Sequence, residues 1–131
     1  MVIGSHPGSE LNMSLGQLST YDLEILMCGE PNFIGVFSID TLPPYLDRSK
    51  TIKMIVNLQP KHMPGNHWVA IYRNREGRGF YFDTFGREPP PTIGNWLSQN
   101  TNKWTYYDKI IQSPNDKVSC SYICMEFLKK L

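Results

Sequence analysis

Residues 67–86, HWVAIYRNREGRGFYFDTFG, contain two apolar runs separated by a short polar turn. The first run, at 67–74, is nearly continuous in apolar residues, which is typical of a strand buried within a sheet. The turn combines charged residues with Gly77, which permits the backbone conformation of a hairpin. The second run, at 79–86, is therefore expected to be the partner strand of the first.

The rest of the chain predicts a helix, then strands, then a helix. Residues 18–31 are expected to form a helix that Ser19 or Thr20 caps and that Gly29 and Pro31 end. Its apolar side would contain Leu23, Ile25, Leu26 and Met27. Further expected elements are strands at 33–43, 50–60 and 103–111, a short helix at 93–99 and a helix at 120–131. This order favours the α+β class, with a mostly antiparallel central sheet flanked by helices.

Length and charge set limits on the organisation of the chain. The 131 residues are expected to form one domain at 18–131, preceded by a flexible tail at 1–17 that is rich in Gly and Ser. The net charge of +1 gives no electrostatic case for binding nucleic acid or a membrane surface. No apolar run approaches the roughly 18 to 20 residues of a membrane span, and the N-terminus lacks the pattern of a signal peptide.

The three cysteines, at positions 28, 120 and 124, are an odd number. A disulfide framework is therefore not expected, and a reducing intracellular compartment fits better. The cysteines and histidines form no CxxC or HxxxH pair, so no metal site and no other cofactor is predicted. Cys28 and Cys124 are interpreted as packing residues, because free cysteine is often buried. His62 lies in a turn bounded by prolines and is expected to face solvent.

His67 and Asp83 stand at the open end of the predicted hairpin, sixteen residues apart. A residue that begins the first strand faces one near the end of the second, so the two side chains can be neighbours. Asp83 interrupts an apolar stretch, and a carboxylate in such surroundings requires a partner. Simpler interpretations stay open: His67 as a hydrogen-bonded structural histidine, and Asp83 as a cap at the strand end.

Cys120 begins the final predicted helix, where partial positive charge and free N–H groups favour a thiolate. In the predicted chemistry Cys120 is the nucleophile, His67 pairs with it and protonates the leaving amine, and Asp83 orients the imidazole. The N–H of Cys120 and the side-chain amide of Gln112 would bind the oxyanion. Gln112 could also be an ordinary turn residue, and Cys120 taken alone would be a core residue.

The order of these residues resembles that of the adenovirus-type (adenain-like) cysteine proteases, which are relatives of the ubiquitin-like-protein proteases. The similar segments are MCGEPNFIGVFSID at 27–40, MIVNL at 54–58, GNHW at 65–68, FDTFG at 82–86 and QSPNDKVSCSYIC at 112–124. Together they extend from about Leu18 to the C-terminus. No single segment is specific to this family, whereas the five segments in this order are specific to it.

The resemblance implies a minimal ubiquitin-like protease fold, with His67, Asp83 and Cys120 as the catalytic residues and Gln112 as the oxyanion donor. Trp68 would be a neighbour of the site and a candidate for lining a substrate cleft. The implied activity is that of a cysteine endopeptidase from a virus or a Maverick/Polinton-like element. It would process structural precursor proteins, with Gly near the cleavage site, in the virion or the host nucleus.

The sequence departs from the family in three places. Ser121 follows the nucleophile, where the family usually has Gly. No cysteine lies between Asp83 and Gln112, where the adenoviral enzymes carry the one that captures an activating peptide. Activation by such a peptide therefore has no support from the sequence, and the net charge of +1 gives little support to nucleic acid as an activator. The chain ends at Leu131, whereas the adenoviral enzymes continue, so a minimal or a shortened member is expected.

Two alternatives keep the fold and change the function. The first is an isopeptidase that removes ubiquitin or SUMO-like modifiers by cutting after a Gly-Gly tail. The second is a binding module without catalytic activity, which would leave Cys120 with ordinary thiol reactivity.

Overall fold

The computed structural model describes residues 18–44, 46–60, 67–116 and 118–131. The elements in chain order are α1 (Thr20–Met27), β1 (Phe33–Ser38), β2 (Ile52–Asn57), β3 (Trp68–Arg73), β4 (Arg78–Phe82), α2 (Pro91–Asn100), β5 (Lys103–Tyr106) and α3 (Ser119–Lys129). Each predicted helix and strand is present, although β5 ends five residues before position 111. The tail at 1–17 and His62 lie outside the described residues, so the flexibility expected of the tail and the exposure expected of His62 stay predictions.

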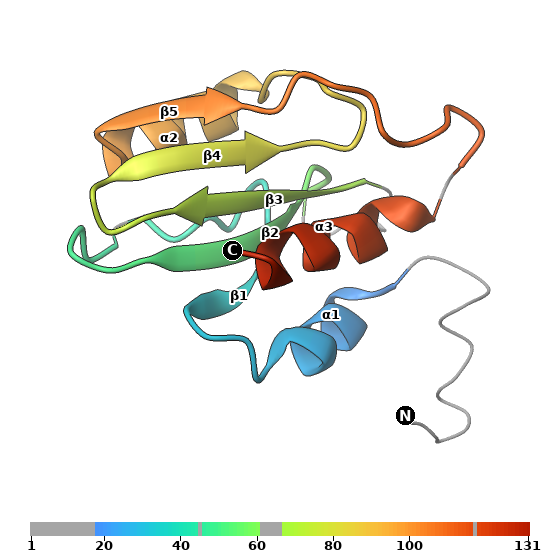
Figure 1. Ribbon diagram of the computed structural model, residues 1–131, viewed down its shortest axis with the longest axis horizontal. Helices are drawn as coiled ribbons and strands as arrows, with labels where there is room; N and C mark the ends of the chain where they lie inside the picture. The colour runs from blue at the N-terminus through green and yellow to red at the C-terminus, as the bar shows by residue number, and fades with distance from the viewer. Residues whose placement is uncertain (1–17, 45, 61–66, 117) are drawn as a thin grey trace.

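The five strands form one sheet in the order β1-β2-β3-β4-β5 (Figure 1). Strands β2, β3 and β4 pair antiparallel, whereas the edge strands β1 and β5 each pair parallel with their neighbour. The α+β class and the β3–β4 hairpin are confirmed, and the sheet is mixed rather than mostly antiparallel. The parallel pairs arise because a long connection joins β1 to β2 and α2 lies between β4 and β5. Each connection is long enough to return the chain to the same end of the sheet.

Helices cover both faces of the sheet. The core cluster on one face combines residues of α1 and α3 with the sheet, and the cluster on the other combines α2 with the sheet. All six residues of β2 are therefore buried. Among the described residues, no helix is long and apolar enough to cross a membrane.

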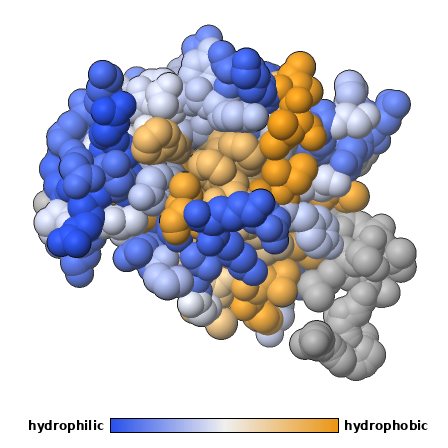
Figure 2. Space-filling view, in the orientation of Figure 1, coloured by the Kyte–Doolittle hydropathy of each residue, from blue (hydrophilic) through white to orange (hydrophobic). Residues whose placement is uncertain are grey.

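The start of α1 is fixed by a capping box. The Ser19 hydroxyl accepts the Asp22 N–H at 3.1 Å, and the Asp22 carboxylate accepts the Ser19 N–H at 3.0 Å. The buried side of α1 is narrower than the sequence predicted. Leu23 and Met27 are buried, but Ile25 and Leu26 are exposed. Figure 2 shows such apolar side chains at the surface among polar ones.

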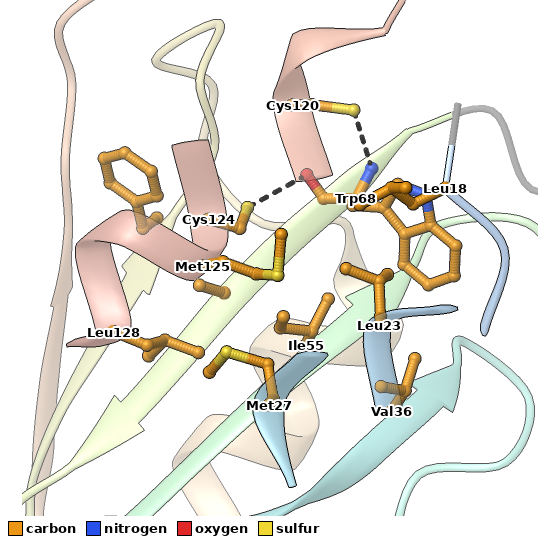
Figure 3. Close-up of a cluster of buried hydrophobic side chains, with 12 residues drawn as sticks. Leu18, Leu23, Met27, Val36, Ile55, Trp68, Cys120, Cys124, Met125 and Leu128 are labelled. Carbon is orange, nitrogen blue, oxygen red and sulfur yellow. Dashed lines mark hydrogen bonds between the residues drawn. The ribbon is translucent and has the colours of Figure 1, made fainter. Parts of the chain in front are cut away.

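Helix α3 packs against β3 through two sulfur contacts with one residue, Trp68 (Figure 3). The N–H of Trp68 donates to Sγ of Cys120 at 3.4 Å. One helical turn later, the thiol of Cys124 donates to the carbonyl oxygen of Trp68, also at 3.4 Å. The first turn of α3 therefore lies beside the beginning of β3.

Candidate active site

His67 lies directly before β3 and Asp83 directly after β4, so the hairpin brings both to the same end of the sheet. Nε2 of His67 is 2.7 Å from Oδ1 of Asp83. Both residues are buried, and Asp83 is only 1% exposed. The carboxylate therefore has the partner that its burial requires.

The turn after β4 holds Asp83 in place. Oδ1 of Asp83 accepts the N–H of Phe85 at 2.9 Å, and its carbonyl accepts the N–H of Gly86 at 2.8 Å. Gly86 has a φ of 71°, and a side-chain carbon there would lie 2.7 Å from the carbonyl oxygen of Lys109. The turn therefore requires glycine. It stacks the ring of Phe85 on the imidazole of His67, with 5.0 Å between centroids.

Cys120 is the second residue of α3 and is 1% exposed. Its thiol lies near enough to the imidazole of His67 to raise the pKa of that ring. Because Nε2 of His67 contacts Asp83, Nδ1 is the ring nitrogen that remains for the thiol. Asp83 and Cys120 therefore both act on the imidazole of His67, Asp83 through Nε2.

The charges of the site favour a protonated His67. Burial opposes the charge of the ring, but the hydrogen bonds and charges of Asp83 and Cys120 outweigh burial and raise the pKa of His67 to about 9. Burial also opposes ionisation of Asp83, but hydrogen bonds from His67 and Phe85 lower the pKa of its carboxyl below the ordinary value. The site therefore suits an imidazolium beside an ionised carboxylate at neutral pH.

Gln112 is 3% exposed, and two neighbours fix its amide. Oε1 accepts the hydroxyl of Thr84, and Nε2 donates to the carbonyl of Asp116 at 2.7 Å. One amide N–H therefore has no partner among the described residues. No hydrogen bond joins Gln112 to Cys120 in the described part of the chain. The structure instead brings Gln112 to the start of α3 through Asp116.

Trp68 contacts both cysteines through its main chain. Its side chain is 1% exposed and packs in the core cluster of α1 and α3, so it offers almost no surface to a substrate. Its role in a substrate cleft stays a prediction. Burial and the nearby charges of Cys120 and Asp83 raise the pKa of the Cys124 thiol, in agreement with a packing role. Cys28 was expected to pack as well, but it follows the last turn of α1 and is exposed.

Four residues near the site were not selected from the sequence as functional: Thr84, Phe85, Arg87 and Asp116. The carboxylate of Asp116 accepts the N–H groups of Val118 and Ser119, at 2.9 and 3.0 Å, and so caps the helix that carries Cys120. An acidic residue just before a predicted helix is a recognisable capping signal. Thr84, Phe85 and Arg87 lie in or beside a turn, where no helical or strand periodicity predicts which residues are in contact.

Among the described residues, no group of three or more His, Cys, Asp or Glu side chains could hold a metal ion.

Comparison with known proteins gives one significant sequence relative and several structural neighbours. No family model matches the chain. A protease of Porcine adenovirus A serotype 3 is 39% identical over 57 residues, which cover 43% of this chain and 28% of that protein. The sequence resemblance to adenovirus-type proteases is confirmed. The chain spans less than a third of the length of this relative.

Solved structures share the fold. The crystal structure of the pS273R protease of African swine fever virus (ASFV) superposes with a TM-score of 0.62 at 16% identity, covering 87% of this chain and 57% of that one. The central domain of the uncharacterized Lpg1148 protein from Legionella pneumophila superposes with a TM-score of 0.56 at 16% identity, covering 88% and 76%. The chain therefore has the α+β fold of the ASFV protease.

Proposed function

We propose that this chain is a cysteine endopeptidase in which Cys120, His67 and Asp83 carry the reaction. The observation that supports this most is the position of the imidazole: its Nε2 lies 2.7 Å from a buried carboxylate, and the carboxylate and the Cys120 thiol together raise its pKa. Proteases with similar sequence or fold support the reaction class.

In the proposed reaction, the thiolate of Cys120 attacks the carbonyl carbon of the scissile peptide bond. The imidazolium of His67 then gives its proton to the leaving amine, and a thioester remains on Cys120. The neutral imidazole next takes a proton from water, which attacks the thioester and releases the carboxylate product. Asp83 keeps the imidazole oriented and stabilises its charge in the first step.

The oxyanion of each tetrahedral intermediate would be bound at the start of α3. The N–H of Cys120 has no intrahelical partner, because it belongs to the first turn of the helix. The amide of Gln112 would supply the second donor through the N–H that has no partner among the described residues. Both donors belong to groups fixed by neighbouring hydrogen bonds, which is the preorganisation that such a site needs.

The substrate is proposed to be a structural precursor protein of a virus or virus-like element, cut close to Gly. This assignment follows from the resemblance to viral proteases and from the small size of Gly, which would suit a largely buried nucleophile.

The first experiment measures alkylation of Cys120 against pH, by mass spectrometry of the digested protein. At pH 6.5, which is below the range in which a free thiol ionises, Cys120 is expected to react faster than exposed Cys28. His67→Ala should remove that advantage. Equal reactivity of Cys120 in parent and variant would refute the proposed nucleophile.

A second experiment measures cleavage of peptides that contain Gly. The parent should cut them, Cys120→Ala should not, and Cys28→Ala should match the parent because Cys28 is exposed and lies at the end of α1. Labelling by a ubiquitin-type propargyl probe together with failure to cut the peptides would replace the endopeptidase assignment with isopeptidase activity.

A further inference from the structure

The second carboxylate oxygen of Asp83 faces an arginine. Nε of Arg87 lies 3.4 Å from Oδ2 of Asp83, while Oδ1 accepts His67 and the N–H of Phe85. The buried carboxylate therefore has a cation on each oxygen when His67 is protonated. His67 lies inside the protein, whereas the Arg87 side chain is 62% exposed.

Arg87 also contacts the ring that stacks on His67. Its guanidinium carbon lies 4.9 Å from the centroid of Phe85, and the Phe85 ring lies 5.0 Å from the imidazole at an interplanar angle of 22°. Arg87 therefore contacts two residues that themselves contact His67: the carboxylate of Asp83 and the ring of Phe85.

The backbone between these residues makes both contacts possible. Gly86 adopts a left-handed conformation that its contact with Lys109 restricts to glycine, so the chain turns back and Arg87 lies beside Asp83. Asp83, Phe85 and Arg87 therefore form one unit around the turn, with His67 against its buried side.

We propose that Arg87 is a positioning residue for the catalytic pair, which holds the Asp83 carboxylate and the Phe85 ring in the geometry that orients His67. This inference rests on the proposed cysteine protease function, because it gives Arg87 a role in orienting the same histidine. Arg87 touches neither the thiol nor the imidazole nitrogens in the described hydrogen bonds, so it acts through Asp83 and Phe85.

The charge of Arg87 predicts a specific effect on the pH dependence. Arg87 is one of the cations that lower the pKa of Asp83, so its removal should raise that pKa. As the pH is lowered, Asp83 would then be protonated, and its ion pair with His67 lost, at a higher pH than in the parent. The acid limb of the rate profile would therefore shift to higher pH. A residue that only supported the fold would change the rate without moving this limb.

The test uses the full chain and three variants of Arg87, with Arg75→Ala as the matched control. Arg75 is also exposed, but it lies in the hairpin turn at the other end of the sheet. Arg87→Met keeps an unbranched apolar stem and removes the charge, Arg87→Lys keeps the charge, and Arg87→Ala removes both. The readouts are the rate of Cys120 alkylation, which needs no substrate, and kcat/KM for a Gly-containing peptide, each against pH.

Arg87→Ala and Arg87→Met are expected to lower kcat/KM about three- to ten-fold, mainly through kcat, and to move the acid limb upward. Arg87→Lys should keep the acid limb near its pH in the parent, and Arg75→Ala should match the parent. At an ionic strength of about 1 M, where screening acts within about 3 Å, the parent should approach the Arg87→Met variant.

An unchanged acid limb and an unchanged rate in Arg87→Met would overturn the role of Arg87. Provided that His67→Ala still slows Cys120 alkylation, the proposed protease would survive that result. Conversely, a Cys120 whose alkylation does not depend on His67 would overturn the proposed function itself, and the role of Arg87 with it. Circular dichroism of each variant separates loss of fold from loss of positioning.

Discussion

Replacing Asp83 by Asn tests the electrostatics of the site through His67. In the folded protein, burial disfavours the charge of the imidazole, but the contacts with Asp83 and Cys120 raise its pKa from 6.5 to about 9. The amide of the Asp83→Asn variant has nearly the same shape and no charge. Without the charge of Asp83, the effect of burial dominates, so the pKa of His67 is expected to fall toward or below its ordinary value.

The same shift predicts a change in stability with pH. A pKa raised from 6.5 to about 9 corresponds to a preference of about 3 kcal/mol for the imidazolium in the folded state. Because the folded pKa is the higher one, this contribution is fully present below pH 6.5 and is lost as the pH rises through about 9. Over that interval, the parent should lose up to about 3 kcal/mol of unfolding free energy relative to Asp83→Asn.

Two measurements check this prediction. Proton NMR follows the imidazole of His67 through its titration, with His67→Ala to assign the signal, and urea unfolding gives the free energy at each end of the pH interval. Asp108→Asn serves as a control, because Asp108 is an exposed carboxylate. A His67 that titrates near 6.5 in the parent, with no change in Asp83→Asn, would refute the reasoning.

Three further predictions concern the surroundings of the site. Gly86→Ala should lower the unfolding free energy by about 2 kcal/mol, because the position has a positive φ and the added Cβ would collide with the carbonyl of Lys109. Urea unfolding measures this, with Gly94→Ala as the control, because a Cβ at Gly94 has no neighbour within 4 Å. Ser121→Ala should stabilise the protein by about 1 kcal/mol, because the buried hydroxyl has no partner among the described residues, and an unchanged urea midpoint would contradict this. Asp116→Ala should lower the thermal midpoint and kcat while KM stays near that of the parent, because the start of α3 loses its cap.

The hairpin and the terminal helix could be predicted because each depends on a local pattern. The apolar runs on both sides of Gly77 define β3 and β4, and the helical spacing of Cys120 and Cys124 defines the buried side of α3. The proximity of His67 and Asp83 follows from the hairpin alone. The parallel edge pairs could not be predicted, because they depend on where the long connections cross the sheet.

The environment of the candidate site was less accessible from sequence. The exposure of Cys28 and Ile25 depends on how α1 rotates against the sheet, and a short helix of mixed polarity does not fix that rotation. The contact of Arg87 with Asp83 depends on the left-handed turn at Gly86, which brings together residues that no helical or strand period would pair.

The two buried cysteines lie one helical turn apart in different surroundings. Both contact the main chain of Trp68, so two points fix the rotation and the height of α3 against β3. At the second point, burial raises the pKa of Cys124, and its thiol stays neutral and donates to a carbonyl. At the first point the sulfur meets a donor, the N–H of Trp68, and an imidazole that a carboxylate keeps charged. Cys124 therefore helps to fix the position of Cys120 against β3, and the two thiols differ in the groups that each one faces.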